Sequence, residues 1–285
     1  MNYLISLFKT EAFKRKPFQT LINSLYLIVS LIFSLNPKIK IRVGHIEIIY
    51  KIFNIRTKNF GGRGLLICRE LIEDLFTVGP KIINNKKNVI IDAGANFGMY
   101  SILFAKLNSS NRVYSVEPFK DYNRIIKYNS KLNKIKNIKI INKVLSDKIS
   151  EYKLNINLGN TSASITRNIN TPNYLKIKST TIDSIVKFYN IKQVDFIKLD
   201  IEGAELLALN GGRTTIKKFK PKIVLECSSK KEFIEVKNFF LKFNYKPYIF
   251  DKNLNRFIMQ RKYVKFYTNL FFFNKKHLKS INLND

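Results

Sequence analysis

The sequence predicts a doubly wound α/β sheet, mostly parallel with an antiparallel edge, preceded by an N-terminal helical segment. From residue 88 onward, short apolar runs typical of strands alternate with stretches of helical periodicity. The runs are nearly continuous in Val, Ile and Leu, as strands covered on both faces of a parallel sheet require. The first run ends in a small turn, D-A-G-A-N-F-G, of the kind that joins a strand to a helix. Alternating β and α elements of this length fold as doubly wound sheets.

The elements follow in a regular order along this region. Helical patterns come after every expected strand except the third, and polar turns separate them. Strands are expected at residues 89–92, 112–117, 138–147, 194–200 and 222–227. Residues 245–250 and 256–260 flank the turn D-K-N-L-N, which predicts an antiparallel hairpin at the sheet edge. The polar stretch 151–173 is more typical of a surface hairpin or loop than of a crossover helix.

The N-terminal part, residues 1–40, differs from the rest of the chain, residues 41–285. Residues 21–35 are mostly apolar but are interrupted by Asn and Ser, and basic residues flank them at 14–16, 38 and 40. About 20 apolar residues are needed to span a bilayer, and a small-x-small cleavage site is missing. The segment therefore favours a helix packed on the domain. A membrane contact through residues 14–40 is the first alternative, and a spanning or signal segment is the second.

The formal net charge of +31 suggests a nucleic-acid or anionic-membrane partner. Lys, Ile and Asn are enriched together along the whole chain, however, and Arg is scarce. This pattern is typical of genomic codon bias. Since Arg is the residue suited to bidentate phosphate recognition, nucleic acid is not the favoured partner.

The two cysteines, Cys68 and Cys227, belong to no C-x-x-C motif, and the histidines are His45 and His277 only. A disulfide framework, a zinc site and a Cys-His dyad are therefore poorly supported. We expect two reduced cysteines, at least one packed in a strand, and a cytoplasmic compartment.

The turn after the first strand is a candidate ligand site. Ligands of doubly wound sheets lie outside the carboxyl ends of the strands, where Asp92 would be delivered. Gly94 and Gly98 would let the backbone pass close to a ligand. Their spacing satisfies neither the dinucleotide fingerprint nor a Walker loop, and a plain tight turn remains an alternative.

Carboxylates end the following strands as well. Glu117 ends the second, where an acidic residue can accept both hydroxyls of a ribose. Asp147 ends the third and Asp200 the fourth. Each alone could be a helix cap or a solvated strand end, but four in register indicate a site.

Taken in order, the segments D-A-G-A-N-F-G, V-Y-S-V-E-P, V-L-S-D, T-T-I-D-S, F-I-K-L-D-I-E-G-A-E and P-K-I-V-L-E resemble the FkbM-type S-adenosylmethionine (SAM)-dependent methyltransferases, over about residues 85–230. The resemblance implies a seven-stranded class I methyltransferase fold with SAM as cofactor. It further implies O-methylation of a hydroxyl on a sugar, a glycan or glycolipid precursor, or a secondary metabolite.

By position, the resemblance also assigns roles to residues. Glu117 would bind the ribose hydroxyls, Ser146 and Asp147 the adenine edge, and Asp200 would face the methyl group and the acceptor. The turn that would cradle the methionine part contains Asp92, Gly94, Ala95, Asn96 and Gly98.

This sequence departs from the family pattern at two places. Ala93 and Phe97 stand where members often carry Val and Ile, and both changes are typical of packing differences. Many members have a His shortly after the acidic residue of the last strand, whereas Glu226 is followed by Cys-Ser-Ser. A His-assisted or His-metal step is therefore in doubt.

Catalysis would rest on carboxylates. Methyl transfer depends mainly on positioning, which can supply about 7 to 11 kcal/mol, so the scarcity of histidines is tolerable. The base candidates are Asp200, which is preferred, Glu202 and Glu205. The two glutamates share a helix face if a helix begins at this turn, and helix-dipole compensation is their alternative role. A divalent metal on Asp200, Glu202 and Glu226 is conceivable by ligand type, but no metal is predicted.

Three other features have plainer interpretations. Thr180, Thr181 and Asp183 form a helix N-cap cluster. Residues 61–64, G-G-R-G, form a surface turn or a lid. The aromatic and basic tail, residues 262–279, packs on the sheet edge or docks a membrane, a glycan or a second subunit.

Other functions fit these motifs less well. A nucleic-acid (RNA) methyltransferase is favoured by the charge, but D-I-E-G at residues 200–203 is no D/N-P-P-Y/F turn, and the Lys-Asp-Lys-Glu set of ribose-methylating enzymes cannot be assembled with confidence. A nicotinamide oxidoreductase is disfavoured by the glycine spacing. A non-catalytic, basic membrane-binding protein on the same fold also stays open. The expected partner is a small-molecule or glycan hydroxyl acceptor, with the enzyme in the cytoplasm or at the inner membrane face.

Overall fold

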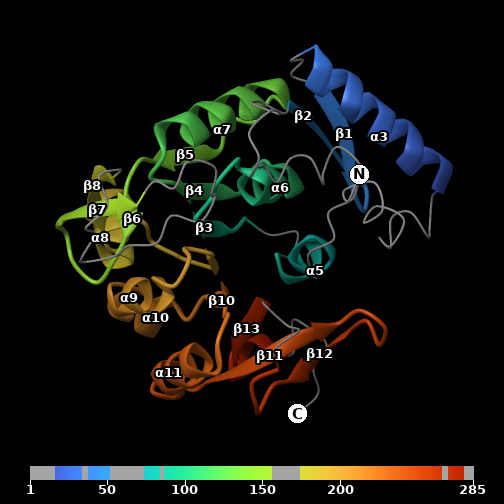
Figure 1. Cartoon of the computed structure of the whole chain (residues 1–285). Coiled ribbons are helices and arrows are strands. Elements are labelled where there is room, and N and C mark those ends of the chain that lie inside the picture. Colours follow the sequence, from blue (N-terminus) through green and yellow to red (C-terminus); the bar gives the residue numbers. More distant parts are fainter. Residues whose placement is uncertain are drawn as a thin grey trace.

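The computed structural model describes most of the chain (Figure 1). The described residues are 17–33, 38–51, 74–83, 87–155, 174–264 and 269–278. Cys68, residues 61–64 and the basic residues at 14–16 lie outside them. The division of the chain near residue 40 stays a prediction, and the first strand begins at Lys38.

The centre of the molecule is an eight-stranded sheet with the order β12-β11-β13-β10-β9-β3-β4-β5. The five strands from β10 to β5 pair in parallel, and β13, β11 and β12 add three antiparallel pairings at one end. Their bounds are β3 Val89–Ala93, β4 Arg112–Val116, β5 Ile138–Ile141, β9 Phe196–Leu199, β10 Lys222–Glu226, β11 Tyr245–Asp251, β12 Arg256–Met259 and β13 Asn269–Asn274. The doubly wound, mostly parallel sheet predicted from the sequence is confirmed.

The strand count is one higher than the seven strands that the resemblance implies, and the tail takes a different place from the expected one. The predicted hairpin of β11 and β12 does form the edge. The tail, however, supplies β13, which inserts between β10 and β11 instead of packing outside them. Its residues Leu270 to Phe273 are buried. A continuous apolar run suits a strand with neighbours on both sides and cover on both faces.

Helices cover both faces of the sheet (Figure 1). One face carries α5 Asp74–Ile82, α6 Met99–Leu107 and α7 Lys120–Leu132, and the other carries α8 Ile182–Phe188, α9 Glu205–Asn210, α10 Arg213–Phe219 and α11 Lys230–Leu241. Along β3 the side chains alternate, so that Ile90 joins the first core and Ile91 the second. The sheet is therefore buried on both faces, and its ligand-accessible positions are at the strand ends.

The third expected strand is broken. β5 ends at Ile141, and residues 144–145 form β6 in a separate three-stranded sheet of order β6-β8-β7. β7 Glu151–Asn155 and β8 Tyr174–Thr180 pair antiparallel, which agrees with a hairpin starting at residue 151. Residues 156–173 between them lie outside the described part. Because of the break, Asp147 does not end a strand of the main sheet.

The N-terminal part adds a helix and a hairpin. α3 Pro17–Ile32 is followed by β1 Lys38–Val43 and β2 Ile46–Lys51, which pair antiparallel. The side-chain amides of Asn129 on α7 and of Asn133, the C-cap residue of this helix, bond the backbone of β2 at Lys51 and Ile49. In the described part of the chain, no helix is both long and apolar enough to cross a bilayer.

The end of the described chain is fixed by a buried histidine. α12 Lys275–Leu278 carries His277, whose Nδ1 accepts from the Asn274 amide while its Nε2 lies 2.9 Å from the Lys220 carbonyl oxygen. Burial, with the nearby Lys276 and Lys222 charges, lowers the pKa of His277 to about 3. The ring is therefore neutral and its role is structural. Cys227 is a buried free thiol directly after β10.

Candidate active site

The turn after β3 can only be built with glycine at two positions. Gly94 has φ of +70°, and a Cβ there would lie 1.7 Å from the carbonyl oxygen of Asp200. Gly98 has φ of +83°, and its Cβ would lie 2.7 Å from the Ile126 side chain. Both the left-handed backbone and the close approach exclude larger residues. The turn thus brings the ends of β3 and β9 into direct contact.

Asp92 lies below this turn and is fully buried. Its Oδ2 accepts a hydrogen bond from the Ser101 hydroxyl, and its Oδ1 is 3.9 Å from Lys198 Nζ. Burial raises the pKa of Asp92, and the Lys198 charge and the Ser101 hydrogen bond oppose this shift. Asp92 therefore supports the turn from beneath.

Lys198 is a residue of the site that the sequence suggests only as part of a Lys-Asp-Lys-Glu set, with Asp200, Lys222 and Glu226, which cannot be assembled with confidence. The side chain is buried on β9, and its ammonium lies 2.9 Å from Asp200 Oδ2 and 4.8 Å from the centroid of the Tyr100 ring. It thus links two of the predicted site carboxylates. Side chains alternate along a strand, so the sequence K-L-D at residues 198–200 places Lys198 and Asp200 on the same side. Buried lysines are rare, however, so this alternation alone does not predict that Lys198 belongs to the site.

Glu117 is held by two backbone donors. Its Oε2 accepts from the Asn96 amide at 2.8 Å and its Oε1 from the Phe119 amide at 2.9 Å. Burial raises the pKa of Glu117 to about 7, although these two hydrogen bonds lower it. Each carboxylate oxygen keeps a further lone pair, so the group can accept two hydroxyls of a ligand.

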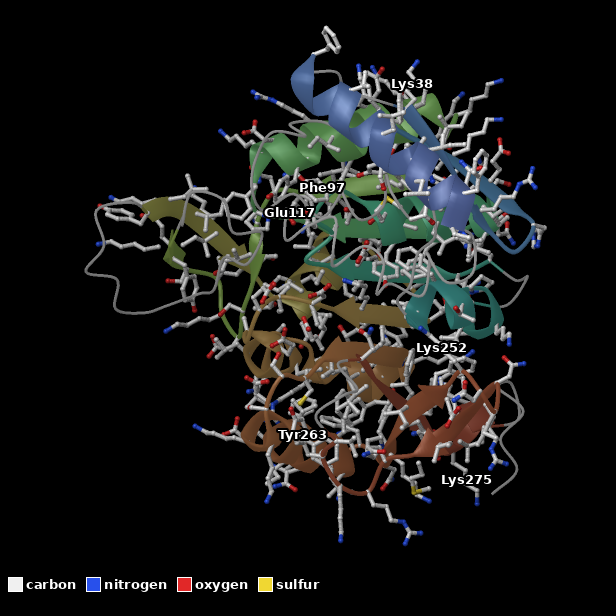
Figure 2. All side chains as sticks on the ribbon, turned by 45° about the vertical axis from the view of Figure 1, so that its right-hand side comes forward. Lys38, Phe97, Glu117, Lys252, Tyr263 and Lys275 are labelled. Carbon is white, nitrogen blue, oxygen red and sulfur yellow. The ribbon has the colours of Figure 1, made fainter. Side chains whose placement is uncertain are left out.

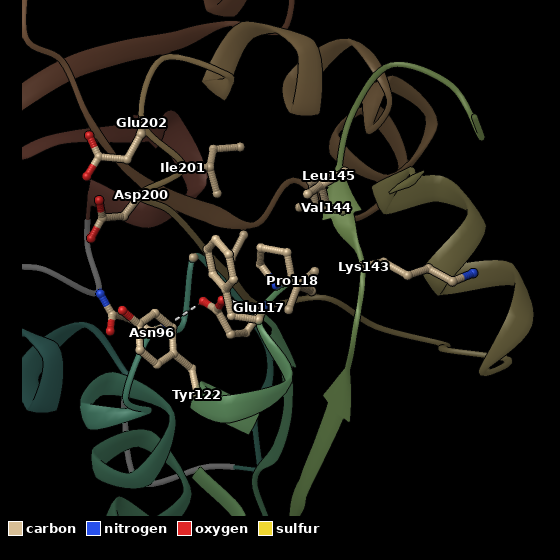
Figure 3. Close-up of a pocket in the computed structure, with 14 residues that line it drawn as sticks. Asn96, Glu117, Pro118, Tyr122, Lys143, Val144, Leu145, Asp200, Ile201 and Glu202 are labelled. Carbon is tan, nitrogen blue, oxygen red and sulfur yellow. Dashed lines mark hydrogen bonds between the residues drawn. The ribbon is translucent and has the colours of Figure 1, made fainter. Parts of the chain in front are cut away.

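A cleft opens beside these groups at the carboxyl ends of the strands (Figure 3). Its space, the open mouth included, is about 710 Å³. The buried Oδ1 of Asn96 has no hydrogen-bond partner among the described residues, which marks a place for a polar ligand. The lining residues are Ala93, Gly94, Asn96, Val116, Glu117, Pro118, Phe119, Tyr122, Lys143, Val144, Leu145, Asp200, Ile201 and Glu202.

Ser146 and Asp147 take a different position from the other predicted cofactor residues. The Ser146 hydroxyl is buried and bonds Tyr152 and Asp147, and Asp147 itself is exposed. Their neighbours Val144 and Leu145 line the cleft instead. The adenine role of the two residues stays a prediction. Apolar side chains on this wall, with the Tyr122 ring, suit a flat base equally well.

Three carboxylates gather at this end of the sheet: Asp200 and Glu202, which follow β9 and line the cleft, and Glu226 at the end of β10. Asp200 shares a hydrogen bond with Glu226, which lies at the end of the neighbouring strand. Burial alone would raise the pKa of Asp200, but the Lys198 charge and the hydrogen bonds from Lys198 and Glu226 lower it. Burial, followed by the charges of Asp200, Glu202 and Glu205, raises the pKa of Glu226 to about 7. Near neutral pH this pair therefore holds either one proton or none.

Glu202 and Glu205 do not share a helix face, contrary to the expectation. α9 begins only at Glu205, and Glu202 lies in the preceding turn with φ of +54°. Glu202 is exposed and lines the cleft mouth. Glu205 is buried, and its Oε1 accepts from the Ile201 amide at 3.0 Å. Its side chain caps the turn, so that a positioning role suits it better than contact with a substrate.

The three residues of the predicted N-cap cluster take different roles. Thr181 caps α8 through the Ser184 amide, and Asp183 accepts from Thr214 and Thr215 on α10. Thr180 is the last residue of β8. Within the described ranges, no group of three His, Cys, Asp or Glu side chains is arranged to hold a metal ion.

The residues present fit a cofactor with an adenosyl group. A glycine turn opens the site at the switch point between β3 and β9, and the fixed carboxylate of Glu117 follows directly after β4, an arrangement that suits nucleoside binding in doubly wound sheets. The sequence profile of the "Methyltransferase FkbM domain" matches residues 92–247, more than half of the chain. The chain belongs to the FkbM methyltransferase family, and its cofactor is SAM.

Solved structures with similar folds include other methyltransferases. A methyltransferase FkbM from Methylobacillus flagellatus KT has 19% identity and a TM-score of 0.46, covering 66% of this chain and 44% of its own. A Streptococcus mutans protein in complex with SAH (S-adenosylhomocysteine) has 10% identity and a TM-score of 0.43, covering 71% and 98%. An rRNA methylase from Streptococcus thermophilus has 8% identity and a TM-score of 0.43, covering 71% and 96%. This chain thus spans less than half the length of the Methylobacillus flagellatus protein. No curated protein matches the sequence.

The pKa of Glu117 predicts how cofactor affinity depends on pH. Below about 7 the carboxyl is protonated, and above it the carboxylate can accept both ribose hydroxyls. SAH should therefore bind about tenfold more tightly at pH 8 than at pH 6, as follows from one ionisation with a pKa near 7. Calorimetric titration at these two pH values measures the change. In Glu117→Gln the affinity should be weaker and nearly constant, and an unchanged pH dependence in this variant would assign the effect to another group.

Proposed function

We propose that this SAM-dependent methyltransferase transfers the methyl group to a hydroxyl of a neutral, polyhydroxylated acceptor: a sugar, a glycan or glycolipid precursor, or a secondary metabolite. The observation that supports the proposal is the group of carboxylates at this end of the sheet: Asp200 and Glu202 line the cleft, and Glu226 is hydrogen-bonded to Asp200. The chain as a whole carries a net charge of +31, so that a concentration of carboxylates at one strand edge stands apart from the rest of the protein.

When bound, SAM supplies an electrophilic methyl group on a positively charged sulfur. The chain's task is to hold an acceptor oxygen in line with that group and to accept its proton. Glu117, Asn96 and the glycine turn are proposed to hold the cofactor, and such positioning can supply about 7 to 11 kcal/mol. Tyr122 and Leu145 would cover the adenosyl part from water.

The Asp200–Glu226 pair is the proposed proton acceptor. Lys198 keeps Asp200 ionised, and Glu226 has a pKa near the working pH, which is the condition for efficient general base catalysis. Asp200 would contact the acceptor hydroxyl, as predicted from the sequence. Glu202, at the mouth, would bind neighbouring hydroxyls, and Glu205 would position the turn that carries both.

A nucleic-acid acceptor is the second candidate, because the net charge favours it. The phosphates next to a target base or ribose would have to approach Asp200, Glu202 and Glu226, however. Negatively charged phosphates and carboxylates repel one another when they are close. A neutral polyol meets no such cost, and carboxylates are good acceptors for its hydroxyls. The local charge at the cleft therefore supports the first candidate over the second.

The test is transfer of labelled methyl from SAM to two matched acceptor sets. One set contains neutral glycans and lipid-linked sugars, and the other contains ribosomal and transfer RNA. We expect label in the glycan set, in a linkage stable to mild alkali as an ether is. Label found only in RNA, or in an alkali-labile ester, would contradict the proposed acceptor while leaving the cofactor assignment intact.

Turnover should depend on pH through Glu226. A protonated Glu226 donates to Asp200 and lowers its basicity, so the rate at saturating SAM should rise about tenfold between pH 6 and pH 8, with a midpoint near 7. Saturation removes the effect of Glu117 on cofactor affinity. In Glu226→Gln the side-chain amide donates to Asp200 at every pH, so the rate should be low and independent of pH. A midpoint that persists in this variant would exclude Glu226 as its source.

A further inference from the structure

An apolar stripe on α3 faces outward. Its large side chains recur at intervals of three and four residues, which places them on one side of the helix. They are substantially exposed, with Phe18 at 76% and Leu25 at 62%. The α3 stripe consists of Phe18, Leu21, Ile22, Leu25, Tyr26 and Val29, and Phe33, just past the helix end, continues it.

Three polar side chains lie on the opposite side of α3 and face the protein. Thr20, Asn23 and Ser24 are buried, and the Ser24 hydroxyl donates to the Thr20 carbonyl. A surface helix of a globular protein normally turns its large apolar side chains inward, whereas those of the α3 stripe are exposed. Contiguous exposed apolar surface marks an interaction site. The α3 stripe is therefore a candidate binding surface.

The charge around the stripe identifies the partner. From residue 12 to residue 46 the sequence has no Asp or Glu, and it has basic residues on both sides of α3. On β1, Lys38, Lys40 and Arg42 are exposed and alternate with buried residues. Glu47 pairs with both Lys40 and Arg42 and offsets only one of these charges. Figures 1 and 2 show that α3 runs beside this hairpin, with Lys38 near it. An apolar stripe with a basic margin complements anionic lipid.

We propose that the α3 stripe binds the surface of an anionic lipid bilayer, with the helix lying in the plane of the interface. The 16 residues of α3 extend for about 24 Å, which is shorter than a hydrocarbon core of about 30 Å. A helix of this length, with Thr20, Asn23 and Ser24 buried against the protein, can insert its exposed apolar side chains into the interface but cannot cross the bilayer. The proposal does not depend on the acceptor of the methyl group.

Because the β1–β2 hairpin is attached to the catalytic fold, binding of the α3 stripe to a bilayer would also orient the cleft. The Tyr50 hydroxyl of β2 donates to the carbonyl of Phe97, inside the cofactor turn. Asn129 and Asn133 hold the same strand to α7. The membrane-binding face is thus connected through β2 to the turn that carries Gly94 and Gly98, and a bound enzyme would present its cleft at a fixed angle to the bilayer.

The test uses the absence of tryptophan from the chain. Leu25→Trp places the only indole in the α3 stripe, and Phe188→Trp places one at a still more exposed position on the far helix α8. The probes are vesicles of phosphatidylcholine, alone or mixed equally with phosphatidylglycerol. We expect the emission of Leu25→Trp to shift to shorter wavelength with the anionic vesicles only, and less at high salt. The emission of Phe188→Trp should stay unchanged.

A second variant tests the surface without a probe. Phe18→Ser with Leu21→Ser and Leu25→Ser changes only exposed positions, and it should lower the vesicle partition coefficient by about tenfold or more while the cofactor affinity is kept. Undiminished sedimentation of this variant with vesicles would overturn the proposal. So would a shift of Leu25→Trp without vesicles that grows with protein concentration, because a second copy of the chain would then cover the stripe.

Discussion

Replacing Asp200 by asparagine is expected to lower the rate of methyl transfer at saturating SAM by about 10²- to 10⁴-fold, the usual contribution of a general base. The substitution keeps the shape of the side chain but removes the carboxylate that Lys198 holds at 2.9 Å and that shares a hydrogen bond with Glu226. Lys198, buried next to Asp92, would lose its nearer counterion. The protein should still fold, because Asp92 retains part of that interaction at 3.9 Å.

Steady-state kinetics with Glu202→Gln as the matched control tests this expectation. Glu202 lines the same mouth but is exposed and lies outside the Asp200–Glu226 pair, so its loss should affect mainly the KM for the acceptor. Comparable rates for Asp200→Asn and the wild type would remove the pair from the mechanism. A rate loss confined to Glu202→Gln would move the base to the mouth of the cleft.

Replacing Gly94 by alanine should abolish SAH binding and destabilise the fold by about 3 kcal/mol or more, from left-handed backbone strain together with overpacking. The added Cβ would lie 1.7 Å from the Asp200 carbonyl oxygen, which is backbone and cannot rotate away. The ends of β3 and β9 would have to separate. Both the cofactor turn and the carboxylate pair would be displaced.

Gly44→Ala separates the two causes. Gly44 has φ of +58°, but a Cβ added there would have no atom within 4 Å, so alanine should cost only the conformational strain, about 1 to 2 kcal/mol. Urea denaturation of both variants measures the difference. Equal stability losses would show that strain, and not the contact between β3 and β9, explains why glycine is needed at position 94.

The main sheet could be predicted because each of its parallel strands is recognisable from its own short stretch of sequence. The runs at β3, β4, β9 and β10 are short, apolar and bounded by turns, and a helix follows each of them. The place of β13 could not be obtained in this way. L-F-F-F at residues 270–273 is typical of a buried strand, but its insertion between β10 and β11 depends on pairings between segments far apart in the chain. The break after Ile141 could not be predicted because the apolar pattern continues through Val144 and Leu145.

Site residues could be predicted where the backbone conformation requires a particular residue type or where a polar residue follows the end of a strand. Gly94, Asn96, Glu117 and Asp200 come together around one cleft for these reasons. Ser146 and Asp147 lie outside its lining, since the third strand does not continue to them. The role of Lys198 could not be predicted because it arises from two neighbours, Asp92 from β3 and Asp200, that only the folded sheet brings to one ammonium group.

The central claim is that the cleft at the ends of β3, β4 and β9 binds SAM through the glycine turn and Glu117. Calorimetric titration of the full chain with SAH, with NAD in parallel, tests it most directly. We predict saturable binding of SAH alone, weakened about 100-fold in Glu117→Ala through the loss of two hydrogen bonds to a charged acceptor, and unchanged in Glu235→Ala on the exposed side of α11. Full SAH affinity in Glu117→Ala, or no binding by the folded wild type, would contradict the assignment of the cleft.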